Sequence, residues 1–215
     1  MLHSFIVLAV LSAVGFYFSG EFMSFLQTDL NIELNAFRAY EALYTQIMIG
    51  LFFGFFTSLP VLVYQLLKFA EPGLKPKEYR IARNFLPFSF MLFIAGFMFS
   101  YQYVVKTSLK FFSQTTSAAE VSAVWGLQTT LGFALKLSAA CGLLFQLPIV
   151  AIVLGKAGLI TGETMRNYRA YFIVALLIVA AIATPPDIIT QLMITLPVIG
   201  LYQISIYLVD YIEPV

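Results

Sequence analysis

Charged residues are scarce in this chain, and their scarcity indicates its class. Only 11% of the 215 residues are Asp, Glu, Lys or Arg, whereas 60% are hydrophobic. The mean hydropathy is +0.90. A soluble domain has about 25% charged and about 45–50% apolar residues, so the composition predicts a polytopic membrane protein. A net charge of only +1 gives no basic footprint for nucleic acid.

Cysteine and histidine occur once each, which excludes several kinds of site. Cys141 has no partner for an internal disulfide, and His3 alone cannot build a histidine-rich metal centre. The sequence has no phosphate-binding loop and no nucleophile–base constellation, so no cofactor and no metal are expected. It also lacks a paired acid dyad and a Ser–Lys pattern, which argues against an intramembrane protease or lipid transferase.

Long apolar runs make up most of the chain, and a helical span needs about 20 such residues. We therefore predict an all-α membrane protein with six transmembrane helices in one polytopic domain, residues 1–215. The spans are expected at about 2–19, 43–67, 85–105, 126–154, 168–183 and 187–209. The first run lacks the positive n-region of a cleaved signal peptide, so a retained helix is expected. The apolar part of the fifth run is unusually short.

Basic residues predict the orientation of these spans. Eight of the twelve Lys/Arg fall in two segments, the central one around residues 68–83 and the later one at 155–169. Cytoplasmic loops collect such residues. Segments 20–42 and 106–125 are then expected to be loops on the outer side, and both termini lie inside (N-in/C-in).

Proline and glycine suggest how the spans pack. Pro60, Pro148 and Pro197 lie within predicted spans that share one orientation, and each should kink its helix. Three such helices would form a curved wall rather than a straight bundle. Gly50 and Gly54 have the small-xxx-small spacing that lets helix backbones approach closely, and we interpret them as packing residues.

Four polar side chains within or beside the spans call for an explanation, because such groups are costly in lipid. Lys136 either extends its stem to the outer interface or lines a wet cavity. Gln146 either bonds the carbonyl freed by Pro148 or contacts another transmembrane helix. Asp187 is either a helix cap or a functional anion, and Gln191 shares its helix face at i, i+4.

Two threonines are predicted to start helices. Thr161 precedes Gly-Glu-Thr and is expected to be an N-cap with an acid in the first turn. Thr184-Pro-Pro-Asp187 predicts a start of the sixth helix with Thr184 as N-cap and Asp187 at the third helical position.

The central polar stretch runs from Phe69 to Arg83 between two apolar runs. Pro72 and Pro76 end the helix before it, because proline lacks an N–H donor. Glu78 lies among lysines and arginines. It is either one charge of a solvated loop or the acceptor for an incoming cation.

Two motifs carry a resemblance to a known family. The first is Phe69-Ala-Glu-Pro-Gly-Leu74 followed by Glu78, and the second is Thr184-Pro-Pro-Asp187 followed by Gln191. Further matching positions are the Glu41 region, Tyr64-Gln65, Gly158-Leu-Ile-Thr161, Arg169-Ala-Tyr171 and Leu201-Tyr202. In joint order and spacing they resemble the TatC family, the multispanning receptor subunit of the twin-arginine protein translocase.

The resemblance implies a glove-like six-helix fold, with short fifth and sixth helices and no catalytic step. It implies that twin-arginine signal peptides of folded proteins bind on the cytoplasmic face. Glu78 would receive the arginines, while Phe69, Pro72 and Leu74 would shape the loop around it. Asp187 and Gln191 match the family's outer hairpin positions.

The resemblance also implies partners and a location. Single-span subunits of the TatA and TatB types are expected along helices five and six and near Gln146, in homo- and hetero-oligomers surrounded by lipid. The proton-motive force would drive transport. A bacterial cytoplasmic membrane is expected, with an organellar membrane as the alternative.

Two departures from the family pattern affect these expectations. The family has an N-terminal segment with a Glu-Leu-Arg motif that supplies a second acid to the signal site, and this sequence begins after that position. The family's intramembrane glutamate on helix four is Gln146 here, which can form hydrogen bonds but cannot carry charge.

A secondary transporter of a small solute is the main alternative from another class. It would use Lys136, Gln146 and Asp187 around a midplane cavity. The sequence shows no inverted-topology repeat and no pair of discontinuous helices. We therefore prefer the receptor interpretation.

Overall fold

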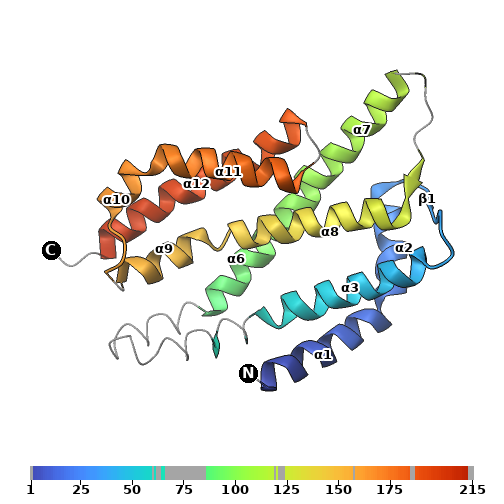
Figure 1. Cartoon of the computed structure of the whole chain (residues 1–215), viewed down its shortest axis with the longest axis horizontal. Coiled ribbons are helices and arrows are strands. Elements are labelled where there is room, and N and C mark those ends of the chain that lie inside the picture. The colour runs from blue at the N-terminus through green and yellow to red at the C-terminus, as the bar shows by residue number, and fades with distance from the viewer. Residues whose placement is uncertain are drawn as a thin grey trace. The chain divides into compact units, whose positions relative to one another are not determined.

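A computed structural model of the protein describes residues 2–59, 61, 64–65, 86–118, 120, 124–156, 158–184 and 187–212 (Figure 1). These residues are mostly helical, as the composition predicts. They divide into two compact units, Met1–Gln65 with Lys106–Lys136 and Leu66–Val105 with Leu137–Val215. Each unit is described by itself.

The first unit consists mainly of helices, together with a pair of very short strands. Its elements are α1 (Leu2–Tyr17), α2 (Ser19–Leu30), β1 (Leu34–Asn35), α3 (Glu41–Thr57), α7 (Lys106–Ala118), β2 (Trp125–Gly126) and the start of α8 (Leu127–Leu144). The strands pair in parallel, with Leu34 opposite Trp125. They join two segments that are far apart in the sequence.

Helix α1 packs along α3 through small residues (Figure 1). A Cβ added to Gly50 would lie 2.8 Å from the Ser12 carbonyl oxygen, and one added to Gly54 would overlap the Ser12 side chain. On the other helix, a Cβ on Gly15 would lie 2.6 Å from the Phe53 Cβ. The Gly50–Gly54 spacing therefore serves close backbone approach between two helices.

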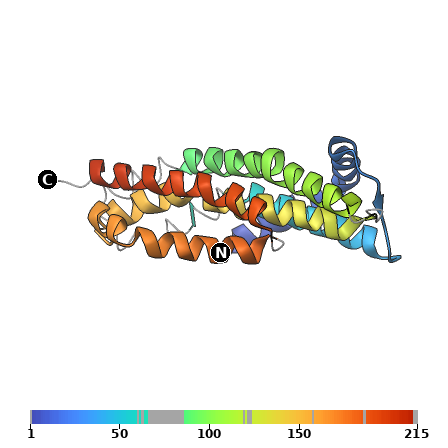
Figure 2. The same ribbon diagram turned by 90° about the horizontal axis from the view of Figure 1, so that it is seen from above.

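The second unit is built mainly from helices of the C-terminal half. Its elements are α6 (Leu86–Phe99), the π-helical stretch η2 (Ser100–Val105), the end of α8, α9 (Leu147–Lys156), α10 (Gly162–Asn167), α11 (Arg169–Ala183) and α12 (Ile188–Ile212). Helix α12 packs against α9 and α11, and Figures 1 and 2 both show α11 and α12 side by side.

A compact core ties the ends of α10, α11 and α12 together in this unit. The ring of Phe172 stacks on that of Tyr202, with centroids 3.9 Å apart. The Tyr202 hydroxyl donates to the Met165 carbonyl oxygen at 2.8 Å. Ile206 and Val209 are fully buried beside them. A hydroxyl inside an apolar core needs such an acceptor.

Three described helices are long and apolar enough to cross a membrane by length and composition: Pro87–Ala118, Leu127–Lys156 and Ile188–Tyr211. A fourth results if the bent pair Ile6–Tyr17 and Ser19–Leu30, 57° apart, is one span. Helices Glu41–Thr57 and Arg169–Ile182 are apolar but shorter. The fifth helix is therefore short, as expected, but the expectation of a short sixth helix is wrong, because α12 has 25 residues. The six spans and their orientation therefore stay predictions.

The segment 106–125, expected to be an outer loop, is largely helical instead. Helix α6 continues through η2 into α7, which ends only at Ala118. No glycine or proline occurs between Lys106 and Ala118, so this stretch has no helix-breaking residue. Helix α2 likewise occupies part of segment 20–42, ending where Asn31 adopts a left-handed conformation with φ of 51°.

Of the three prolines predicted to kink their helices, Pro148 and Pro197 lie within the described residues. Helix α8 ends at Leu144, and α9 begins at Leu147. Pro148 has no N–H for the Leu144 carbonyl four residues earlier, which accounts for the interruption there. Pro197 lies inside α12, which continues through it. Pro60 lies outside the described residues.

Replacing Gly54 with alanine should destabilise the first unit. The added Cβ would overlap Ser12, and overpacking of this kind costs about 1–3 kcal/mol. We expect the apparent melting temperature of the purified protein in detergent, followed by circular dichroism, to fall by roughly 2–10 °C. Gly20→Ala is the control, because a Cβ at Gly20 in α2 has nothing within 4 Å. Equal melting temperatures for both variants would contradict the packing role.

Candidate functional site

The predicted signal-binding loop lies outside the described residues. Glu78, Phe69, Pro72 and Leu74 all fall between Gln65 and Leu86, the described residues that flank this stretch. Their assignment as a binding site therefore stays a prediction.

Gln146 is held by a residue of another helix in the second unit. The Ser89 hydroxyl of α6 donates to the Gln146 Oε1 at 2.5 Å. The Gln146 Nε2 donates in return to the Ser89 carbonyl oxygen at 2.9 Å. The amide therefore bonds across to α6, rather than to the carbonyl freed by Pro148. One further N–H and one lone pair remain for a partner helix, and that role stays a prediction.

Asp187 caps α12, and this corrects the predicted helix start. Its Oδ1 accepts the Thr190 N–H at 2.7 Å, so Asp187 itself is the N-cap and α12 begins at Ile188. Thr184 instead follows the last residue of α11, and its hydroxyl donates to the Ala180 carbonyl oxygen. A carboxylate is among the best N-cap groups, so the later residue takes the position.

The second oxygen of Asp187 is a notable feature of this cap. Oδ2 is buried and has no hydrogen-bond partner among the described residues. Buried polar atoms are usually paired, so this one calls for an explanation. The cap interpretation of Asp187 is confirmed by its geometry, while a further functional role stays a prediction.

Gln191 joins the two helices of the α11–α12 hairpin. Its Nε2 donates to the Leu177 carbonyl oxygen of α11 at 2.9 Å. Its backbone N–H donates to the Asp187 carbonyl oxygen at 3.3 Å, as the i, i+4 spacing requires. Asp187 and Gln191 thus lie on one helix face, and Gln191 fastens α12 to α11.

Lys136 lies in the middle of α8 and is exposed. Among the described residues it forms no ion pair. At a rise of 1.5 Å per residue, it lies about 14 Å along the helix from Leu127. This placement suits both a stem that extends to the interface and a polar contact within the membrane, so both interpretations stay open.

Large apolar side chains point outward along both helices of the hairpin. On α11 they are Tyr171, Val174, Ile178, Val179 and Ile182, and on α12 they include Ile188, Leu192, Leu196, Ile204 and Tyr207. A soluble protein would not expose such a surface. In a membrane it faces lipid or another apolar helix.

Polar contacts gather where α10 meets the end of α12. Thr161 caps α10 as predicted, its hydroxyl oxygen accepting the Thr164 N–H at 3.0 Å. Arg166 donates to Asp210 at 2.5 Å. The same carboxylate lies against Gly162, where any Cβ would overlap it. A larger residue at this first helical position would have to displace the Asp210 carboxylate.

Glu41 has a role that sequence reasoning missed. It is only 4% exposed. Its Oε1 accepts the Gln128 N–H at 3.0 Å, and its Oε2 accepts the N–H groups of Phe37 at 2.7 Å and Arg38 at 3.3 Å. These bonds fasten the loop before α3 to the start of α8, beside the two strands. An acid in the first turn of a helix was the available signal.

The surroundings of Glu41 stabilise its charged form. The backbone N–H of Gln128, above all, together with those of Phe37 and Arg38, lowers the pKa of this carboxyl below its usual value, against the opposing effect of burial. Glu41 precedes the predicted span 43–67. It is therefore an anion held in place by backbone N–H groups at the start of α3. Among the described residues, no group of three or more His, Cys, Asp or Glu is placed to hold a metal.

Apolar helices of span length, outward-facing apolar side chains and scarce charge together define an α-helical integral membrane protein. A family profile described as "Sec-independent protein translocase protein (TatC)" matches residues 1–197. The chain belongs to the TatC family, and is thus a component of a protein-transport system.

Individual relatives agree with this family. The chain is 39% identical to the Sec-independent protein translocase protein TatC of Listeria innocua, over 90% of this chain and 79% of the relative. It is 33% identical to TatCy of Bacillus subtilis, over 94% and 82%. It also matches a crystal structure of the twin-arginine translocase receptor TatC in DDM, with a TM-score of 0.85 and 34% identity, over 95% of this chain and 93% of that one.

Replacing Glu41 with glutamine should destabilise the first unit most clearly near neutral pH. The amide nitrogen cannot accept a hydrogen bond, so at least one of the buried N–H groups loses its acceptor. We expect a melting temperature lower by a few degrees at pH 7. Glu33→Gln, at an exposed position before β1, is the control and should change little.

The pH dependence of stability tests the same contact. A depressed carboxyl pKa stabilises the fold above the unfolded value of about 4.3, and this contribution is lost as pH falls through the lower folded pKa. The difference in melting temperature between the wild type and Glu41→Gln should therefore shrink below about pH 4. A difference that stays constant down to pH 3 would contradict the proposed role of the charge.

Proposed function

We propose that this chain is the receptor subunit of a twin-arginine translocase, binding signal peptides with paired arginines on its cytoplasmic side. The supporting observation is that the family profile runs through residues 1–197 and so includes the central loop. The structural relative is described as a receptor of this kind. The chain would act by binding and assembly, without a catalytic step.

In this proposal Glu78 receives the arginines. A guanidinium forms two parallel hydrogen bonds to a carboxylate, which distinguishes arginine from lysine. Phe69, Pro72 and Leu74 would shape the loop around it. A partly exposed pair of this kind contributes only about 1 kcal/mol, so the apolar stretch of the signal peptide has to supply the rest.

The proposal includes six spans with both termini in the cytoplasm. This orientation puts the central loop and the segment 155–169, which hold most of the basic residues, on the side where such residues gather. The bent pair α1–α2 would count as one span with an outer extension. The contacts of Glu41 and the two strands would then lie on the outer side.

Single-span partner subunits would bind along the hairpin and near Gln146. The outward apolar side chains of α11 and α12 offer a surface for an apolar helix. Gln146 keeps hydrogen-bonding capacity beyond its bonds to Ser89, which would suit a polar group on such a helix. Transport itself would draw on the proton-motive force of a bacterial cytoplasmic membrane.

A photo-reactive residue at position 74 tests the signal site while leaving Glu78 intact. It is combined with a precursor carrying paired arginines and with the same precursor carrying paired lysines. We expect strong crosslinks to the arginine precursor only. Glu78→Gln should weaken them about fivefold, the equivalent of about 1 kcal/mol, and Glu78→Lys should weaken them further.

The matched control is Glu163→Gln, which removes an exposed acid of the other basic segment. It should leave the crosslinks unchanged. Full crosslinking to the arginine precursor in Glu78→Lys, with normal membrane insertion, would overturn the assignment of Glu78. Equal crosslinking to both precursors in the wild type would overturn the receptor function.

A further inference from the structure

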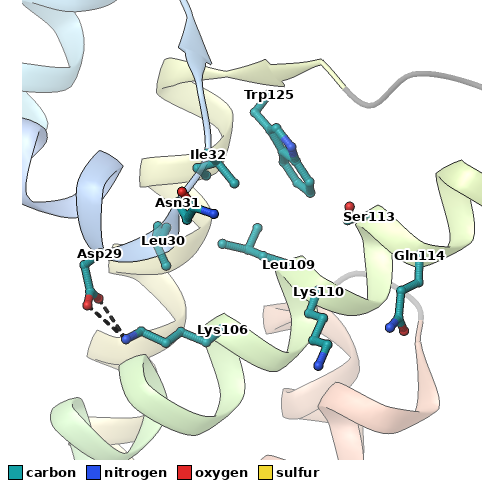
Figure 3. Close-up of a pocket in the computed structure, with 10 residues that line it drawn as sticks. All are labelled: Asp29, Leu30, Asn31, Ile32, Lys106, Leu109, Lys110, Ser113, Gln114 and Trp125. Atoms are coloured by element: carbon teal, nitrogen blue, oxygen red, sulfur yellow. Dashed lines mark hydrogen bonds and ion pairs between the residues drawn. The ribbon is translucent and has the colours of Figure 1, made fainter.

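A pocket of about 430 Å³ opens in the first unit beside α7 (Figure 3). Three segments line it: the end of α2 with Asn31 and Ile32, one face of α7 with Lys106, Lys110 and Gln114, and Trp125 of β2. Figure 3 places Trp125 at one end of the pocket and the two ammonium groups toward the other. Both polar and apolar side chains line it, so it can contact a ligand that has a polar and an apolar part.

Helix length places this pocket at headgroup depth. The continuous helix Pro87–Ala118 has 32 residues, or about 48 Å at 1.5 Å per residue, whereas the hydrocarbon core is about 30 Å thick. The third predicted span, residues 85–105, ends just before Lys106, so in the proposed membrane crossing α7 leaves the hydrocarbon where the pocket begins. Tryptophan and lysine are the residues that favour this interface. This depth depends on the proposed membrane crossing of the helix, not on signal recognition.

The charges of the pocket favour an anion. Asp29 forms an ion pair with Lys106, with Nζ and Oδ2 2.9 Å apart, and this pair ties the end of α2 to α7. Lys110 lies one turn further along α7, is exposed and forms no ion pair among the described residues. One positive charge is therefore left over, with the side chains of Gln114, Ser113 and Asn31 as neighbouring hydrogen-bond donors.

We propose that this pocket binds the phosphodiester headgroup of an anionic phospholipid of the outer leaflet. Lys110 provides the charge, the neighbouring polar side chains donate to phosphate and headgroup oxygens, and Leu109 and Ile32 contact the adjoining apolar part. A lipid fits better than a free anion, because a free anion would make no use of the apolar lining or of the depth. Bound lipid would fasten the ends of α2 and α7 at the membrane surface.

The chain's single tryptophan gives a direct readout, since Trp125 lines the pocket. The purified full chain in neutral detergent is titrated with short-chain phosphatidylglycerol, with short-chain phosphatidylcholine and with inorganic phosphate, while the fluorescence of Trp125 is followed. We expect a saturable change with phosphatidylglycerol at concentrations several-fold below those of the other two. Lys110→Gln should weaken it roughly three- to tenfold, and Lys110→Arg should retain it.

Lys156→Gln at the end of α9, in the other unit, is the matched control and should bind like the wild type. Circular dichroism of each variant separates lost binding from lost folding. Equal responses to both lipids, or an unchanged response in a folded Lys110→Gln, would overturn the proposal. Saturation by inorganic phosphate at the same concentration as phosphatidylglycerol would also overturn it and indicate a free-anion site. The titration uses no precursor protein, so none of these three outcomes bears on the proposed signal-receptor function.

Discussion

Close approach of helix backbones is the constraint on which the first unit depends. In hydrocarbon, apolar side chains gain little by leaving lipid for one another, so helices associate through tight packing and internal hydrogen bonds. Gly50 and Gly54 of α3 meet Ser12 of α1 with no room for a Cβ, and Gly15 meets Phe53 in the same way. In the second unit Gly96 and Gly142 similarly receive the rings of Phe145 and Phe93.

Many polar groups within these helices have a hydrogen-bond partner nearby, because lipid offers them none. Hydroxyl groups donate to carbonyl oxygens one turn earlier, as in Thr45 of α3 and in Thr195 and Ser205 of α12. Longer side chains bond across helices: Gln146 to Ser89, and Gln191 to Leu177. Each bond between helices also fixes the rotation of one helix relative to its neighbour.

Hydropathy and turn residues predicted the all-helical class, and the cap at Thr161 was correctly assigned. Three features could not be predicted from the sequence. Helices α2 and α7 lie in polar segments, where an amphipathic helix and a loop have similar composition. The start of α12 was placed three residues early, because Thr184 and Asp187 are both good caps and only geometry decides between them. The partners of Gln146 and Glu41 lie 57 and 87 residues away, a separation that no local pattern spans.

The acids of the first unit differ from the proposed signal-binding acid in whether their partners can be exchanged. In the first unit, Glu41 and Asp29 both have partners, Glu41 in backbone N–H groups and Asp29 in Lys106. Carboxylates held in this way cannot exchange partners without leaving buried donors or a cation unpaired. A receptor for arginines needs the opposite, an acid whose partner is exchangeable. On physical grounds that favours the proposed role of Glu78, which has lysines and arginines as sequence neighbours, over the acids that the described helices already use.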